Sequence, residues 1–109
     1  MDRQTVETYL MSMPNARLEH PFGPSVAVFK IYDNMFALIR EGKDPVQLSL
    51  KCDPQLAEVL RAKYAEVMPG YHLNKKYWNT MVLAGQLTWD EVQDLIRHSY
   101  NLAITNEGE

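Results

Sequence analysis

Val46-Gln47-Leu48-Ser49-Leu50-Lys51-Cys52-Asp53-Pro54 is the stretch that decides the fold class. Apolar and polar residues alternate along it as far as the cysteine. This pattern predicts a strand with one face buried and the other face in water. Asp53 and Pro54 then begin a helix, because aspartate is a favoured N-cap and proline is favoured at the first helical position. The stretch therefore places a strand directly before a helix.

Two more strands are predicted upstream, and together with the first they form an antiparallel meander. The range 25–32 is rich in valine, isoleucine and aromatic residues, and 35–40 is the returning strand. A helix precedes them, since an apolar stripe with helical spacing ends at Pro14. The stripe consists of Val6, Tyr9, Leu10 and Met13.

The downstream half is predicted to add two strands and a final helix. The helix that begins at Pro54 has an expected buried stripe of Leu56, Val59, Leu60 and Tyr64. We predict a short extended segment over 71–73 and a strand over 77–83. Thr88 and Glu91 have the spacing of a capping box, so the last helix is predicted over 88–103. The order α-β(3)-α-β(2)-α indicates an α+β domain of two layers, with one antiparallel sheet and helices on one face.

The composition is that of one ordinary globular domain. The chain has 109 residues, of which 46% are hydrophobic and 23% are charged, which is enough for a core of its own. We expect a single domain over 1–109 with a frayed polar tail over 105–109. The formal net charge of -3 argues mildly against nucleic-acid binding. Basic residues are concentrated in 51–80, with five basic and three acidic side chains, so an anion-binding surface is expected there.

Signatures of catalysis are absent from the sequence. It contains no nucleophile elbow, P-loop, zinc-protease helix or dinucleotide fingerprint, so we expect no enzyme and no cofactor. The spacing of His20, Cys52, His72 and His98 does not match a metal site. A single cysteine fits a reducing cytoplasm. No signal peptide or membrane-length apolar run is present, so we expect a cytoplasmic protein without a membrane partner.

Most of the residues suited to binding lie in one run, from His72 to Thr80. Its lysines could contact phosphates, its histidine and asparagines could bond a phosphate or a base edge, and its tryptophan could stack on a base. The candidate nucleic-acid-binding residues are Lys51, His72, Asn74, Lys75, Lys76, Trp78 and Asn79. The structural alternatives are a solvated strand start for the lysines, turn formation for the histidine and asparagines, and a core position for the tryptophan.

This run also resembles the signature of a known bacterial family. His72-Leu73-Asn74-Lys75-Lys76-Tyr77-Trp78-Asn79-Thr80 is similar to the HLNK-x-x-W-x-T motif of the MmcQ/YjbR family, and weaker matches extend from about Val6 to Ala103. The resemblance implies a fold like those of the frataxin (CyaY) and secretion-chaperone groups. It also implies a double-wing mode of DNA binding, in which β-hairpins flank a helix on the duplex.

Two functional hypotheses follow for a non-enzymatic binding module, whose oligomeric state the sequence leaves open, with a monomer favoured. The first is weak, largely non-specific DNA binding, favoured by the basic run and the family resemblance. The second is binding of a protein or peptide partner, favoured by the acidic net charge. A continuous positive face joining Lys51, Arg61, Lys63, Lys75 and Lys76 would support the first hypothesis. An exposed apolar groove would support the second.

Overall fold

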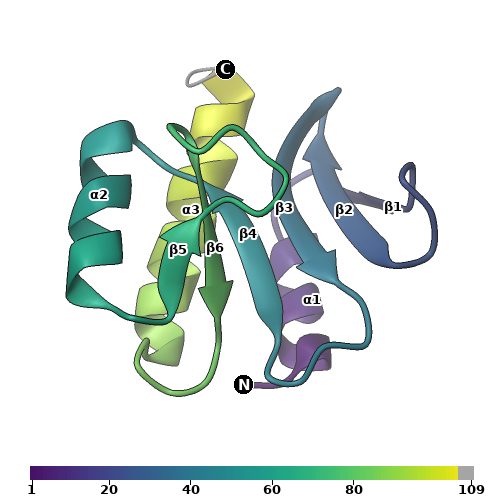
Figure 1. Cartoon of the computed structure of the whole chain (residues 1–109). Helices are drawn as coiled ribbons and strands as arrows, with labels where there is room; N and C mark the ends of the chain where they lie inside the picture. The colour runs from purple at the N-terminus through teal and green to yellow at the C-terminus, as the bar shows by residue number, and fades with distance from the viewer. Residues whose placement is uncertain (106–109) are drawn as a thin grey trace.

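The computed structural model describes residues 1–105 and contains three helices and a six-stranded sheet (Figure 1). The elements in chain order are α1 (Arg3–Met11), β1 (Arg17–Glu19), β2 (Val26–Ile31), β3 (Asn34–Arg40), β4 (Gln47–Lys51), α2 (Pro54–Lys63), β5 (Val67–Pro69), β6 (Trp78–Val82) and α3 (Trp89–Thr105). The predicted tail over 105–109 lies, from residue 106 onward, outside the described residues.

The sheet is antiparallel throughout, with strand order β1-β2-β3-β4-β6-β5. This confirms the predicted α+β class. The structure adds the short edge strand β1, which was not predicted because three residues are too few to show a period. The extended segment predicted over 71–73 is wrong, since the strand that pairs with β6 is Val67–Pro69. Over residues 1–105, no helix is both long and apolar enough to cross a membrane.

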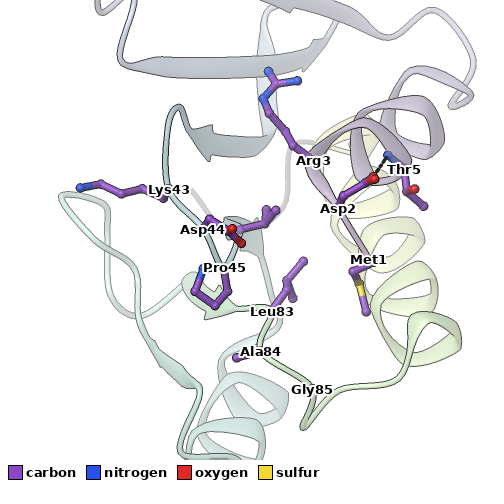
Figure 2. A pocket seen from close by; sticks show the side chains of 11 residues that line it. Met1, Asp2, Arg3, Thr5, Lys43, Asp44, Pro45, Leu83, Ala84 and Gly85 are labelled. Atoms are coloured by element: carbon purple, nitrogen blue, oxygen red, sulfur yellow. Dashed lines mark hydrogen bonds between the residues drawn. The ribbon is translucent and has the colours of Figure 1, made fainter.

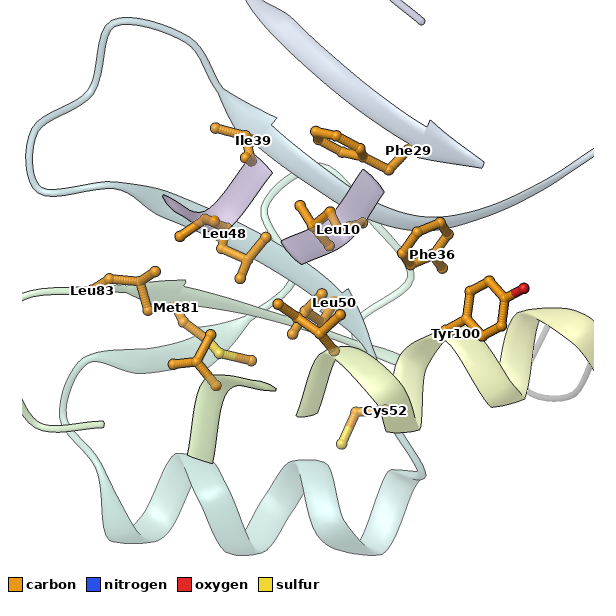
Figure 3. Close-up of a cluster of buried hydrophobic side chains, with 14 of the residues drawn as sticks. Leu10, Phe29, Phe36, Ile39, Leu48, Leu50, Cys52, Met81, Leu83 and Tyr100 are labelled. Atoms are coloured by element: carbon orange, nitrogen blue, oxygen red, sulfur yellow. The ribbon is translucent and has the colours of Figure 1, made fainter. Parts of the chain in front are cut away.

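One face of the sheet packs against the helices and forms the main core (Figure 3). The alternation predicted for 46–52 is correct, because Leu48 and Leu50 are fully buried in this core with Met81 of β6. Val92 and Ile96 of α3 are buried against the same face. Burying each such side chain contributes roughly 1.5–3 kcal/mol before the loss of conformational entropy.

Local capping rules account for where the helices begin. The Asp53 carboxylate accepts hydrogen bonds from the backbone N–H groups of Gln55 and Leu56. The predicted capping box is present, with Thr88 N donating to Glu91 at 2.9 Å and Glu91 N donating to the Thr88 hydroxyl at 3.1 Å. The buried stripe of α2 differs from the prediction. Val59 is exposed and Ala57 is buried in its place, so the face of α2 that packs toward β5 and β6 passes through Ala57 and Leu60.

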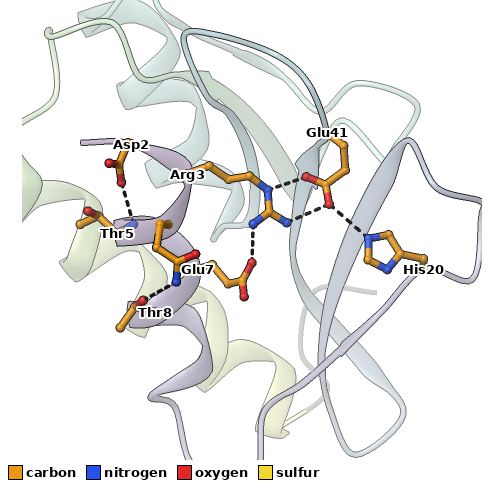
Figure 4. Close-up of polar contacts among 8 residues, drawn as sticks. Asp2, Arg3, Thr5, Glu7, Thr8, His20 and Glu41 are labelled. Atoms are coloured by element: carbon orange, nitrogen blue, oxygen red, sulfur yellow. Dashed lines mark hydrogen bonds and ion pairs between the residues drawn. The ribbon is translucent and has the colours of Figure 1, made fainter.

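A polar cluster joins α1 to the end of β3 (Figure 4). The Arg3 guanidinium donates to both carboxylate oxygens of Glu41, at 2.5 and 2.8 Å, and also pairs with Glu7. His20 lies 3.2 Å from the same Glu41 carboxylate. The hydrogen bond from Arg3 is the main reason why the pKa of Glu41 is lowered from its ordinary value of 4.5. The cluster ties the first helix to the outer half of the sheet.

The opposite face of the sheet, here called the open face, carries a second apolar cluster. Val28, Leu38 and Trp78 are buried there. A bulge in the β2–β3 ladder makes Phe36 the extra residue, so Phe36 packs into the main core while Met35 pairs with Lys30 on the open face. The pairing of Ser49 with Thr80 and of Lys51 with Trp78 puts these side chains on the open face. The alternation over 46–52 predicted that this face would be wet, but Ser49 and Lys51 are buried.

Candidate binding groove on the open face of the sheet

The open face is covered in part by the segment 70–77, here called the crossing loop. Figure 1 shows it passing in front of the sheet from β5 toward β3, on the side away from α1 and α3. Gly70 lets the loop start close to the sheet, because a Cβ atom there would lie 2.7 Å from the Trp78 Cβ. Tyr71 N donates to the Thr80 hydroxyl at 2.9 Å, and that hydroxyl lies 2.7 Å from the Ser49 hydroxyl.

Arg61 of α2 holds the return of the crossing loop. Its Nε donates to Asn79 Oδ1 at 2.6 Å, and its Nη2 donates to the carbonyls of Lys75 and Trp78. The Asn79 amide in turn donates to the Ala57 carbonyl of α2 at 3.3 Å. One guanidinium therefore connects a helix, the loop and the first residues of β6. These hydrogen bonds fix the conformation of the crossing loop, so a ligand beside the loop would lose little free energy in ordering it.

The crossing loop and the open face enclose a groove of about 440 Å³, here called the open-face groove. Its lining residues are Phe22, Val26, Met35, Leu38, Arg40, Ser49, Tyr71, His72 and Leu73. Most of these side chains are apolar or aromatic. Phe22 and Tyr71 are large and exposed, at 63% and 48%. A concave, mostly apolar site of this size with a few polar groups is typical of a ligand pocket.

The polar groups of the groove cluster around Arg40. Its guanidinium lies 4.3 Å from the centre of the Tyr71 ring, and its Nη1 donates to Gln47 Oε1 at 3.0 Å. The Tyr71 and His72 rings meet edge to face, with centroids 4.1 Å apart. A cation stacked on an aromatic ring and tethered by an amide is held in one orientation. The groove thus combines an apolar floor with one fixed positive group.

A larger cavity, of about 830 Å³, lies where α1 begins, between the β3–β4 loop and the turn after β6 (Figure 2). Its polar side chains have structural roles. Asp2 caps α1 by accepting a 2.8 Å hydrogen bond from Thr5 N, and Arg3 is paired with Glu7 and Glu41. The cavity has no comparable apolar lining or aromatic wall, so the open-face groove is the stronger candidate for ligand binding.

Part of the predicted nucleic-acid set lies inside the fold. Lys51 is 4% exposed, Trp78 is 6% exposed and Asn79 is fully buried. The prediction that these three side chains contact nucleic acid is therefore wrong for this structure, because a duplex cannot reach them. Trp78 belongs to the apolar cluster of the open face, and Asn79 accepts the hydrogen bond from Arg61.

The other predicted residues lie together on the exposed crossing loop. His72, Asn74, Lys75 and Lys76 are all exposed. Asn74 caps a turn by accepting from Lys76 N at 3.0 Å, and the Lys75 ammonium donates to the Gly70 carbonyl at 2.9 Å. His72 has φ of 57°. These residues therefore shape the loop, and their side chains also reach solvent.

The histidines and the cysteine do not gather at one site. His98 Nε2 accepts from Asp53 N at 3.1 Å, and His20 is beside Glu41. Among residues 1–105, no three metal-binding side chains come together. Burial raises the pKa of Cys52 to about 11, with the nearby Asp53 as a smaller cause. The Cys52 thiol is thus protonated and inert at neutral pH, which outweighs its position before a helix N-terminus.

The groove was not predicted from the sequence, because the alternation over 46–52 indicated a wet open face. A signal was available in the run from Val26 to Phe29, which is apolar at four successive positions. A continuous apolar run indicates a strand buried on both faces. The same holds for Phe36 to Ile39. No local pattern identified Arg61, whose partners lie 14 to 18 residues away in the chain.

Comparison with known proteins assigns the chain to a family. The YjbR family model matches residues 11–102. YbdF of Escherichia coli O157:H7 is 34% identical, with 95% of this chain and 88% of YbdF covered. YjbR of Escherichia coli K12 is also 34% identical, with 88% of this chain and 81% of YjbR covered.

Two solved structures share the fold. A crystal structure of a Deinococcus radiodurans protein superposes with a TM-score of 0.85 at 35% identity, covering 97% of this chain and 80% of that one. A crystal structure of a Pseudomonas syringae protein gives a TM-score of 0.81 at 32% identity, covering 94% of this chain and 99% of that one. The matched signature, the fold and the relatives agree, and the chain belongs to the YjbR family.

Proposed function

We propose that this protein is a non-enzymatic interaction module that binds an apolar segment of a partner polypeptide in the open-face groove. The observation that carries the proposal is the groove itself, a 440 Å³ space lined mainly by apolar and aromatic side chains. Phe22 and Tyr71 remain exposed at its rim. An exposed aromatic rim around an apolar floor is the usual chemistry of a protein-binding patch.

The expected positive face for DNA is broken up in this structure, which also favours a protein partner. Lys51 is buried. The Arg61 guanidinium is occupied by Asn79 and two backbone carbonyls. Lys63, Lys75 and Lys76 remain exposed. Two of the five basic residues expected on that face are therefore held within the protein, which weakens the support for a duplex.

The test is selection of random peptides on the immobilised protein, followed by affinity measurement on the recovered sequences by fluorescence anisotropy. Burying one phenylalanine side chain is worth roughly 1.5–3 kcal/mol, so Phe22→Ala should weaken binding by about tenfold or more. Tyr71→Ala should weaken it similarly. Tyr32→Ala is the matched control, because Tyr32 is equally exposed, at 61%, and does not line the groove.

Two results would count against this function. One is the recovery of no binding peptide. The other is a set of binders whose affinity is unchanged by Phe22→Ala and by Tyr71→Ala while both variants remain folded.

DNA binding is a second candidate, supported by the turn at the tip of the crossing loop. A regular strand would point Lys75 and Lys76 to opposite sides. Here both lie in a turn and are exposed beside Asn74. Titration with duplex DNA at two salt concentrations should show an affinity of about 10⁻⁴ to 10⁻⁶ M and a shallow salt slope. Absence of binding at low salt, or no loss in the Lys75→Ala/Lys76→Ala variant, would exclude this candidate.

A further inference from the structure

Arg40 is the one fixed positive group of the open-face groove, and its surroundings favour an anionic ligand. Arg3, Arg17 and Arg97 each form an ion pair with a carboxylate. Arg40 is half-buried yet forms no ion pair with any residue in the range 1–105. Arg61 also lacks a carboxylate, but three protein oxygens occupy its guanidinium. A carboxylate is therefore the group that the Arg40 environment lacks.

The guanidinium is also oriented before any ligand arrives. The hydrogen bond to Gln47 uses one of its five N–H donors, and the Tyr71 ring supports its plane. A planar guanidinium matches a carboxylate with two parallel hydrogen bonds, and such charge-assisted bonds are among the strongest in proteins. Because the side chain is already held, less rotamer entropy is lost on binding.

The position of the groove limits how a polypeptide could be held. Its floor is formed by β2, β3 and β4, which are interior strands of the sheet. Their backbone groups are paired with neighbouring strands, so a ligand cannot add to them as a further strand. Recognition must therefore rest on side chains and on charged end groups. A C-terminal residue is the shortest piece of polypeptide that combines an apolar side chain with a carboxylate.

We infer that the open-face groove binds the C-terminal residue of a partner polypeptide, with an apolar side chain on the groove floor and the terminal carboxylate on Arg40. This inference rests on the proposed function and names its specificity. Phe22, Val26, Met35, Leu38 and Leu73 would contact the side chain. Arg40 would form the ion pair, and Tyr71 and His72 would flank the carboxylate.

The test compares three probes by NMR titration of the ¹⁵N-labelled protein. N-acetyl-leucyl-phenylalanine carries the terminal carboxylate, and its C-terminal amide is the neutral match. N-acetyl-phenylalanyl-glutamic acid α-amide carries the carboxylate on a side chain. We expect the first probe to shift the backbone signals of the groove and to bind about tenfold more tightly than its amide. The side-chain acid should bind no better than the amide.

Arg40 variants assign that preference to one residue. Arg40→Gln should abolish the difference between the acid and its amide, and Arg40→Lys should keep part of it, because lysine retains the charge and loses the two-pronged geometry. Arg17→Gln is the control, since Arg17 is an exposed arginine on β1 that does not line the groove. Thermal melts confirm that each variant is folded.

The outcomes separate this inference from the function on which it rests. Equal binding of acid and amide, lost in Phe22→Ala, would leave the proposed function in place and overturn the role of Arg40. Preference for the side-chain acid would overturn the terminal-residue assignment. A preference for the acid that persists in Arg40→Gln would also overturn the inference. If none of the three probes shifted the backbone signals of the groove, both the inference and the proposed function would be contradicted.

Discussion

Replacing Arg61 with methionine tests whether one guanidinium holds the crossing loop in place. Methionine keeps much of the side-chain length and removes all three hydrogen bonds. Most of the lost stability should come from Asn79, because this residue is fully buried and its amide oxygen would be left without a hydrogen bond. The Trp78 carbonyl also accepts from Gly70 N at 2.9 Å, and the Lys75 carbonyl belongs to an exposed residue that water can reach.

The expected cost is therefore set by one buried acceptor and not by three charged hydrogen bonds. An unsatisfied buried polar group costs about 1–3 kcal/mol, so we expect a loss of about 2 kcal/mol in the free energy of unfolding. For a domain of this size that corresponds to a fall in melting temperature of roughly 8 to 12 °C.

Two assays check this result. Urea unfolding followed by circular dichroism gives the stability, and limited trypsin digestion reports the loop, because Lys75 and Lys76 are trypsin sites within it. We expect faster cleavage there in Arg61→Met. Arg97→Met is the control, since the contacts of Arg97 with Asp94 and with the Tyr9 hydroxyl are exposed and should contribute little to stability. If Arg61→Met lowered the free energy of unfolding no more than Arg97→Met and left the rate of trypsin cleavage unchanged, Arg61 would not hold the crossing loop in place.

Three further predictions concern other parts of the fold. Gly70→Ala should destabilise the protein by about 1–3 kcal/mol, measured by urea unfolding, because the new Cβ would clash with Trp78. Hydrogen bonding from Arg3 lowers the pKa of Glu41 in the folded protein. The ionised Glu41 carboxylate should therefore stabilise the fold fully above about pH 4.5, and this stabilisation should be lost as the pH falls through the folded-state pKa. Urea unfolding of Glu41→Gln should accordingly show a stability deficit that shrinks on acidification; a constant deficit would contradict this. The Cys52 thiol, with a pKa of about 11, should react with a disulfide reagent much more slowly in the native protein than in urea.

Local rules predicted the features of this fold that depend on local chemistry. Asp53 and the pair Thr88–Glu91 begin helices because their side chains satisfy backbone groups two or three residues away. The phase of β4 follows from simple alternation, which fixed Leu48 and Leu50 in the core. Such features are visible in sequence because the partners are near neighbours.

The candidate binding groove could not be predicted in the same way, because distant residues build it. Ser49 has the polarity of a surface residue, and only the crossing loop makes it the floor of a groove. Arg40 has the position of an ordinary residue at a strand end, and its contact with Tyr71 joins residues 31 positions apart in the chain. The sequence therefore left the hypothesis of a polypeptide partner open, and the proposal of such a partner rests on the groove.

The two outermost strands of the sheet have a consequence for solution behaviour. β1 and β5 are each three residues long, and β5 ends in Pro69, which has no N–H to donate. Short edges and an edge proline discourage another chain from extending the sheet. These edges therefore protect a protein with an exposed apolar groove from polymerising through backbone hydrogen bonds. We expect concentrated samples to self-associate, if at all, reversibly through side chains, without the fibrillar growth that long unprotected edges promote.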